Sequence, residues 1–203
     1  LGKAAMKIGE VIMLATNLQP FLMGIVVSVL VGAALTLPIS SAAICAAFGL
    51  TGLAGGAAVA GCCAQMIGFA VMSFKENGWG GLVSQGIGTS MLQMGNIIKN
   101  PRIWIAPIVT SAITGPVATC LFKLQMNGTA VSSGMGTCGF VGQIGVYSGW
   151  VNDVAAGTKS AITMMDWAGL ILISFVLPAV ICPLINWLLK KAGWVKDGDM
   201  KLQ

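Results

Sequence analysis

Two short Gly-Thr stretches combine the residue types in this sequence that are best suited to binding a polar ligand. They are residues 86–89 (Gly-Ile-Gly-Thr) and residues 134–137 (Gly-Met-Gly-Thr). Each follows a serine and precedes a glutamine: Ser84 and Gln93 in the first, Ser133 and Gln143 in the second. Glycine permits turns that other residues resist, and irregular backbone at membrane depth is tolerated where it lines a protein-walled or watery cavity. The pair therefore predicts a binding site of the kind that transporters build.

Neutral polar side chains, not ionisable ones, form the predicted site. Amides and hydroxyls both donate and accept hydrogen bonds, as a polyhydroxylated solute requires, and an unpaired one in hydrocarbon would be costly. For any one of them, an interhelical hydrogen bond is the alternative use. Thr89, Gln93, Thr137 and Gln143 are predicted to line one cavity where the two turns meet near the bilayer midplane. The full set of predicted solute-binding residues is Gln85, Thr89, Gln93, Asn96, Thr137 and Gln143.

The sequence carries no pattern of a catalytic, metal or cofactor site. It contains no histidine, which removes the mechanisms that rely on imidazole, and it contains no Cys-x-x-Cys. Its six cysteines lie in apolar surroundings and are expected to be free thiols. Most carboxylates fall at the ends of apolar runs, and Asp166 is expected at the membrane interface. We therefore expect no enzyme activity, no metal and no cofactor.

The composition requires an integral membrane protein. Of the 203 residues, 56% are hydrophobic and only 8% are charged, with a mean hydropathy of +0.88. Runs long enough to cross a bilayer lie at about 11–36, 41–73, 102–123 and 163–189. The second run is longer than one crossing needs, so it is expected to be either a broken helix, with the break near Gly49 to Gly56, or a steeply tilted one. We predict an all-α polytopic protein with about four spans and two re-entrant glycine-rich hairpins, at about 79–98 and 133–150.

The basic residues predict the orientation of these spans. If both ends of the chain lie in the cytoplasm, nine of the eleven lysines and arginines fall inside, and only Lys123 and Lys159 fall outside. Because these residues flank apolar runs and form no patch, nucleic acid is not an expected partner. The two hairpins would then enter from opposite faces, as in an inverted repeat. The alternative is two glycine-rich loops that are alike by chance.

Small residues and prolines in the spans suggest how the helices pack. Gly52, Gly56, Ala60, Ala64 and Gly68 repeat every fourth position, which predicts a close approach to another helix. Pro107, Pro116, Pro178 and Pro183 predict kinks in the last two spans, although prolines are common in membrane helices in general.

Three longer strings resemble one family of membrane proteins. They are residues 84–93 (SQGIGTSMLQ), 99–107 (KNPRIWIAP) and 134–150 (GMGTCGFVGQIGVYSGW). They are similar to bacterial phosphotransferase-system enzyme IIC, in the branch that includes the perfringolysin regulator PfoR, and the likeness covers about residues 10 to 190. The resemblance implies a sugar-permease-like domain, a homodimer, re-entrant hairpins around a sugar, and cytoplasmic IIA and IIB subunits that phosphorylate it. Better-known members use a histidine and a glutamate near the sugar, and neither Gly-Thr segment contains them.

These observations predict one membrane-embedded domain over residues 1–203, a C-terminal fragment of a longer chain, with a short cytoplasmic tail at 190–203. The expected function is binding and translocation of a small polar solute, a sugar, by a IIC component in the bacterial inner membrane. A membrane sensor that keeps the permease architecture and controls gene expression without transport is the alternative. A passive channel is disfavoured because no charged ring or carbonyl filter is evident.

Overall fold

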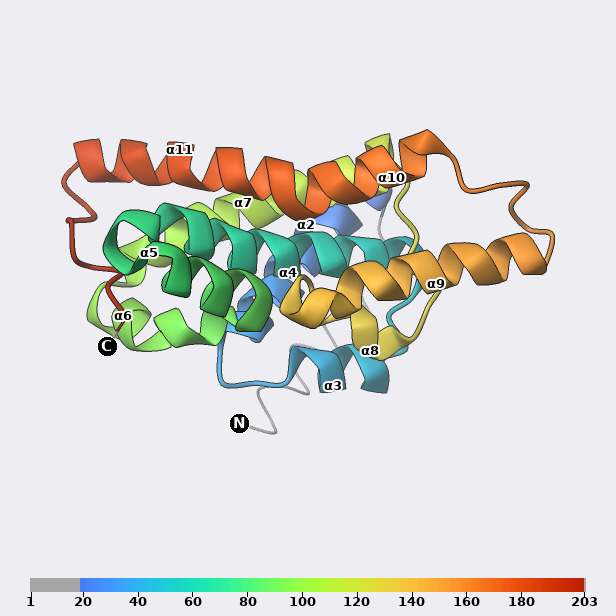
Figure 1. The fold of residues 1–203 in the computed structure, drawn as a ribbon, viewed down its shortest axis with the longest axis horizontal. Helices are drawn as coiled ribbons and strands as arrows, with labels where there is room; N and C mark the ends of the chain where they lie inside the picture. Colours follow the sequence, from blue (N-terminus) through green and yellow to red (C-terminus); the bar gives the residue numbers. More distant parts are fainter. Residues whose placement is uncertain (1–18, 203) are drawn as a thin grey trace.

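The protein is all-α over the part that the computed structural model describes, residues 19–202. No strand occurs within these residues, where the only sheet-like pairing is an isolated bridge between Gly52 and Met126. Long helices lie roughly parallel along the longest axis, and shorter helical segments fill the space beside them (Figure 1). The predicted all-α polytopic architecture is confirmed.

Three helices are long and apolar enough to cross a membrane. They are α4 (Gly52–Met72), a continuous helix over Pro101–Leu121, and a continuous helix over Met164–Lys191, with 21, 21 and 28 residues. The second comprises η3 (Pro101–Trp104), α7 (Ile105–Pro116) and η4 (Val117–Leu121); the third comprises α10 (Met164–Ile171), η6 (Leu172–Val176) and α11 (Leu177–Lys191). A shorter apolar helix, α2 (Pro20–Thr36), covers the described part of the first predicted span. Residues 11–18 of that span lie outside the described residues.

The predicted break in the second apolar run is confirmed. Helix α3 (Ser41–Ala47) ends before α4 begins, and the chain turns between them with positive φ at Gly49 (60°) and Gly52 (61°). Glycine adopts this left-handed conformation without the steric penalty of a side chain. The Gly52 amide and carbonyl each form a 3.0 Å hydrogen bond with Met126. The turn is therefore tied to the segment that follows η4.

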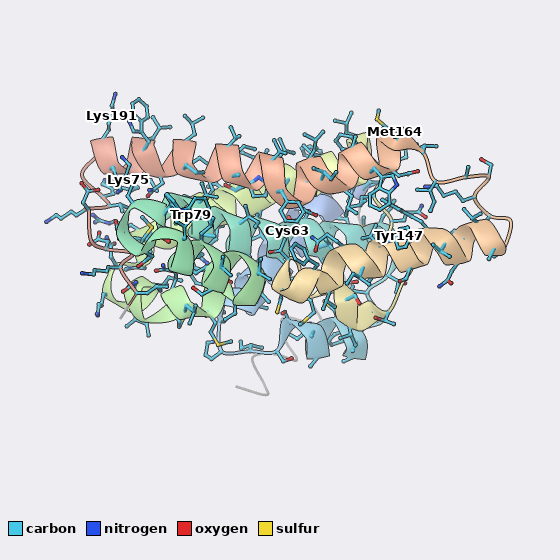
Figure 2. The ribbon with its side chains drawn as sticks, in the orientation of Figure 1. Cys63, Lys75, Trp79, Tyr147, Met164 and Lys191 are labelled. Atoms are coloured by element: carbon cyan, nitrogen blue, oxygen red, sulfur yellow. The ribbon has the colours of Figure 1, made fainter. Side chains whose placement is uncertain are left out.

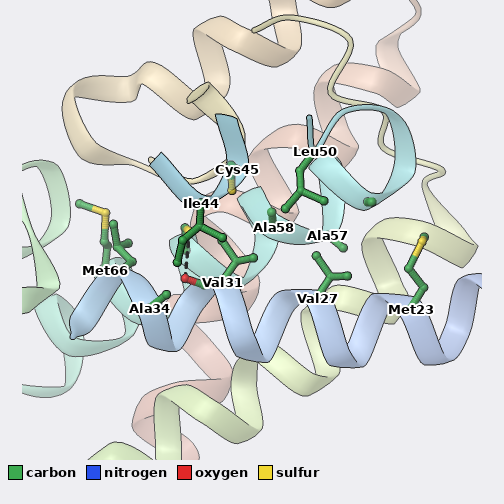
Figure 3. Close-up of a cluster of buried hydrophobic side chains, with 13 residues drawn as sticks. Met23, Val27, Val31, Ala34, Ile44, Cys45, Leu50, Ala57, Ala58 and Met66 are labelled. Atoms are coloured by element: carbon green, nitrogen blue, oxygen red, sulfur yellow. Dashed lines mark hydrogen bonds between the residues drawn. The ribbon is translucent and has the colours of Figure 1, made fainter. Parts of the chain in front are cut away.

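Helix α4 is the centre of the bundle and packs against α2, α7 and α11. Its closest helix contact is with α2, where a Cβ added to Gly61 would lie 1.9 Å from the Ser28 carbonyl oxygen. Figure 3 shows the apolar cluster that α2, α3 and α4 bury around Val27, Val31 and Ala58. Close backbone approach of this kind favours helix association in lipid through dispersion contacts.

The small residues that repeat every fourth position on α4, here called the stripe, contact more than one neighbouring segment. Gly56 lies against the carbonyl of Leu124, which belongs to the irregular segment after η4, while Gly68 lies against Cys182 of α11. The prediction that the stripe packs on a helix is therefore right at Gly68 and wrong at Gly56. The residue that approaches α2 most closely, Gly61, is not a member of the stripe.

Two helical hairpins enter the bundle from opposite ends (Figure 1). The first hairpin, residues 74–99, consists of α5 (Phe74–Val83), η1 (Ser84–Gly88), η2 (Ser90–Gln93) and α6 (Met94–Lys99). The second hairpin, residues 130–155, consists of α8 (Ala130–Ser133), η5 (Cys138–Phe140) and α9 (Val141–Ala155). Each hairpin contains one of the Gly-Thr stretches close to its inner end.

The chain beyond α11 is docked on the first hairpin. Residues 192–202, here called the strap, run down one end of the bundle to α6 (Figure 1). Glu76 accepts hydrogen bonds from the amides of Gly198 and Met200, at 3.1 and 2.9 Å. The side chain of Met200 is fully buried. The predicted tail at 190–203 thus begins within α11, and its described part beyond that helix is anchored to the first hairpin through Glu76 and the buried Met200, although most of its residues are exposed.

Candidate functional site

The two Gly-Thr stretches meet in the middle of the bundle. The Thr137 hydroxyl donates a 2.6 Å hydrogen bond to the Gly86 carbonyl oxygen and lies 3.5 Å from the sulfur of Met66 on α4. Gly136 is required beside it, because its φ is 53° and a Cβ there would lie 2.6 Å from that of Cys62. Both Thr137 and Gly86 are buried. The inner ends of two hairpins that enter from opposite ends are thus joined directly.

Gln143, in the first turn of α9, lies next to this junction. Its Nε2 donates to the Ser174 hydroxyl of η6 at 3.0 Å and to the Cys63 sulfur of α4 at 3.3 Å. Cys63 is one helical turn from Met66, so Thr137 and Gln143 contact neighbouring turns of α4, near the middle of the bundle (Figure 2). The Gln143 Oε1 is buried and has no hydrogen-bond partner among the described residues.

Two π-helical segments shape this region. Gly86 belongs to η1 and Ser174 belongs to η6, and both segments use the wider i→i+5 hydrogen bonding. Pro178 explains the second, because it lacks the amide that would donate to the Ser174 carbonyl in a regular α-helix. π-segments within α-helices frequently occur at functional sites. Here they place a carbonyl and a hydroxyl of two distant segments beside the second hairpin.

Three further predicted residues form a chain of amides, here called the amide track. Gln93 Nε2 donates to Gln85 Oε1 at 2.8 Å, and Asn96 Nδ2 donates to Gln93 Oε1 at 2.9 Å. The track ends at the strap, where the carbonyl oxygens of Met200 and Lys201 each accept a 3.0 Å hydrogen bond, from Gln93 and Asn96. Gln85 also donates to the Ser73 hydroxyl. These amides therefore hold the first hairpin and the strap together.

Five of the six predicted residues fall into two groups in the structure, and the sixth, Thr89, belongs to neither. Thr137 and Gln143 lie at the junction, and Gln85, Gln93 and Asn96 lie along the amide track. Thr89 is half-buried and accepts a 3.1 Å hydrogen bond from the Met91 amide, so it caps η2. The two turns meet as predicted, while a single cavity lined by residues of both groups stays a prediction.

Another polar network at the centre was missed as a site by the sequence interpretation. Gln65 Oε1 accepts hydrogen bonds from the Thr36 hydroxyl at 3.1 Å and from the Trp104 indole at 2.9 Å. The Thr36 hydroxyl lies 2.9 Å from that of Ser90 in the first hairpin. Nothing in the local sequence pattern around Gln65 indicates these partners. This network connects α2, α4 and the first hairpin.

Charged side chains lie at the two ends of the bundle, away from this neutral interior. At the strap end, Lys190 contacts Asp197 at 2.5 Å and Glu76 at 3.8 Å, and its ammonium lowers the pKa of Asp197 below the usual 3.8. At the other end, Asp166 contacts Lys159 at 2.6 Å and caps α10 together with Thr163, as an interfacial position predicts. The described residues contain no cluster of His, Cys, Asp or Glu that could hold a metal ion. Neutral hydrogen bonding is the chemistry that the centre offers.

Comparison with known proteins gives one match over nearly the whole chain. A family model described as "Phosphotransferase system, EIIC" matches residues 1–202. No curated protein matches, and no solved structure matches.

Proposed function

The chain belongs to the phosphotransferase-system EIIC family, and from this premise we propose that it binds a small polar solute, a sugar, and translocates it across the membrane. The fold fits this proposal because apolar spans surround a centre that is polar and uncharged. Hydroxyls of a sugar can donate to and accept from such groups without moving a charge through hydrocarbon.

One observation carries the proposal: the buried, unpartnered Oε1 of Gln143 beside the junction of the two Gly-Thr turns. A buried acceptor without a donor is costly, and such exceptions call for an explanation. A solute hydroxyl that donates to this oxygen removes the cost. Ser174, which is fully buried and bonded to the same amide, would orient Gln143 for that contact.

The hairpins supply a means of access from either side. They enter from opposite ends and are joined at Thr137 and Gly86, so separation at that junction would expose the centre to one end or the other. We propose that both hairpins are re-entrant elements of the membrane domain. Alternating access in transporters commonly moves one such element against the rest of the bundle around a central site.

The family also supports the partners and location that we propose. Cytoplasmic IIA and IIB subunits would carry the phosphoryl group, so this chain would be the transporter component and not the catalyst of phosphoryl transfer. We further propose a homodimer in the inner membrane of a bacterium, with both ends of the present chain in the cytoplasm. The basic residues support this orientation, because nine of eleven then lie inside.

The second candidate is a sensor that binds the same solute without transporting it. Its support is the absence of histidine from the sequence, together with the absence of a carboxylate among the contacts described for Gln143 and Thr137. Binding through neutral groups alone does not require coupling to phosphorylation. Sugar uptake into vesicles that contain the chain and its IIA and IIB partners separates the two, since a sensor binds sugar and gives no uptake.

The binding proposal is tested by replacing Gln143 with alanine. Loss of a hydrogen bond to a buried ligand oxygen costs about 1 to 3 kcal/mol, or roughly a 5- to 150-fold weaker affinity. The measurement is the thermal shift of the purified protein on addition of glucose, galactose, N-acetylglucosamine and mannitol, because a bound ligand raises the apparent stability. Asn152→Ala is the matched control, since Asn152 is an exposed amide on the same helix. Equal sugar affinity in Gln143→Ala and wild type would contradict the proposed site.

A further inference from the structure

A cavity lies at the end of the bundle opposite the strap. It has a volume of about 450 Å³ and is formed by the irregular segment after η4, the last turns of α9, the loop after α9 and the start of α10. This volume falls within the range of small-molecule sites, about 300 to 1,000 Å³. The cavity is separate from the Gln143 junction, because its lining residues Trp150 and Asp153 lie two to three turns further along α9 than Gln143, which is not part of the lining.

Asp153 presents a carboxylate to this cavity in a fixed position. Its Oδ2 accepts a 2.7 Å hydrogen bond from the Asn127 amide, and its carbonyl accepts from the amides of Thr158 and Lys159 at 2.9 and 3.1 Å. Asn127 and Thr158 also line the cavity. Among the described residues, Asp153 Oδ1 has no hydrogen-bond partner. One carboxylate oxygen is thus held in place and the other is open to a ligand.

An ion pair and a tryptophan also line this cavity. Lys159 pairs with Asp166 at 2.6 Å and lies 5.3 Å above the centre of the Trp150 ring. Trp150 is only 3% exposed and packs edge-on against Trp167, with the ring centres 5.6 Å apart. Since the charges of Lys159 and Asp166 compensate each other, this part of the lining offers hydrogen-bonding atoms without a net charge, supported from beneath by the buried Trp150.

Lys123 at the cavity wall has a strained backbone. Its φ is 46°, a left-handed conformation that costs a residue with a side chain free energy and that concentrates at functional sites. The next residue is held firmly, because the Leu124 amide donates to the Ala118 carbonyl at 2.8 Å and the Leu124 carbonyl packs on Gly56. Lys123 is exposed and forms no ion pair within the described residues. Lys123 therefore brings an ammonium, unpaired among the described residues, to the lining of the cavity.

We propose that this cavity is a second binding site, for a neutral polyhydroxylated solute, distinct from the Gln143 junction. Two ammonium groups and two carboxylates balance in charge, so a ligand with a net charge gains no attraction. The lining contains both donors, such as Lys123 and Asn127, and acceptors, such as Asp153, and sugar hydroxyls can pair with both kinds. The kind of solute that we propose here rests on the proposed function, whereas the location of the site does not.

The test measures protection of a single cysteine at the cavity, which distinguishes binding here from binding at Gln143. In a cysteine-free background, Gln125→Cys places a thiol in the cavity wall, and Ala156→Cys places one on the exposed loop outside it. The rate of maleimide labelling is measured with and without glucose, N-acetylglucosamine or mannitol. At ten times the dissociation constant, a bound solute slows labelling of Gln125→Cys about tenfold by mass action and leaves Ala156→Cys unchanged.

Two added substitutions assign the protection to this site. Asp153→Asn keeps the size of the side chain and removes its charge, and it is expected to weaken protection about tenfold or more. Gln143→Ala is expected to leave protection of Gln125→Cys unchanged. Absence of protection by all three probes, protection by glycine in preference to them, or protection that Gln143→Ala abolishes would each overturn the second site. If sugars still shift the melting temperature while Gln125→Cys stays unprotected, the second site is overturned and the proposed function is not contradicted.

Discussion

The hydroxyl of Thr137 donates to the carbonyl oxygen of Gly86, 51 residues away, at 2.6 Å. This hydrogen bond joins the inner ends of two hairpins that enter the bundle from opposite ends. Water cannot take the place of this hydrogen bond, because the Thr137 side chain is fully buried. The packing of both hairpins on α4 therefore depends on a contact that a single substitution can remove.

Replacing Thr137 with valine, which has nearly the same shape, tests this contact. The Gly86 carbonyl would be left without its donor, which is expected to lower the free energy of unfolding by about 1 to 3 kcal/mol. Thr137→Ser keeps the hydroxyl and is the control. Thermal unfolding of the purified protein in detergent measures the difference, and equal stability of the valine variant and wild type would show that the junction does not hold the hairpins.

Gly61 is expected to tolerate no side chain. An added Cβ would lie 1.9 Å from the Ser28 carbonyl oxygen of α2, so Gly61→Ala must force α2 and α4 apart. We expect a loss of about 1 to 3 kcal/mol, as for overpacking in other interiors. Gly80→Ala on α5 is the matched control, because nothing lies within 4 Å of its added Cβ. Equal melting temperatures for the two variants would contradict the close approach.

Glu76 is expected to hold the strap on the first hairpin. Glu76→Gln removes the charge that accepts from the amides of Gly198 and Met200, and charge-assisted hydrogen bonds contribute about 1.5 to 3 kcal/mol. Amide hydrogen exchange at those two positions should therefore accelerate roughly tenfold or more. Asp197→Asn changes an exposed pair in the same strap and should have little effect near neutral pH. Unchanged exchange in Glu76→Gln would show that other contacts suffice.

The ion pair between Lys190 and Asp197 predicts a pH dependence of the strap. Because the pKa of Asp197 is lowered from 3.8, its stabilising effect is present above that value and is lost as the pH falls through the lower folded-state pKa. Lys190 is the main cause and Lys75 adds to it. Exchange protection of the strap should be constant from about pH 8 to 5 and fall below about pH 4. Asp197→Asn should remove part of that fall, and identical profiles would contradict it.

The orientation of the chain is testable by cysteine labelling. Ala156→Cys in a cysteine-free background should react with an impermeant reagent from outside the cell, and Lys99→Cys should react only after the membrane is opened. Both positions are exposed in the structure. Reaction of position 156 only from the cytoplasmic side would reverse the topology and place the cavity beside Asp153 on the cytoplasmic side.

Much of the architecture could be predicted because its signals are local. The last two apolar runs predict their helices to within about two residues at each end, and Gly49 and Gly52 mark the break before α4. The Gly-Thr stretches also mark where two distant hairpins meet. The length of an apolar run, its hydropathy and its glycines influence the backbone of that segment itself, so their effect can be predicted without knowing which segments pack beside it.

Tertiary structure decided which side chains pair and therefore what each polar residue can do. From the sequence alone, Gln93 and Gln143 are equal candidates for binding a solute. In the structure, Gln93 is hydrogen-bonded to Gln85 and the strap, while Gln143 retains a buried acceptor without a partner among the described residues. The strap has a polar sequence that does not predict packing. It is held on the first hairpin because Glu76, more than 120 residues earlier, accepts hydrogen bonds from its amides. Hydropathy and spacing determine that amides lie at membrane depth, whereas their hydrogen-bond partners depend on distances between segments that only the folded chain sets.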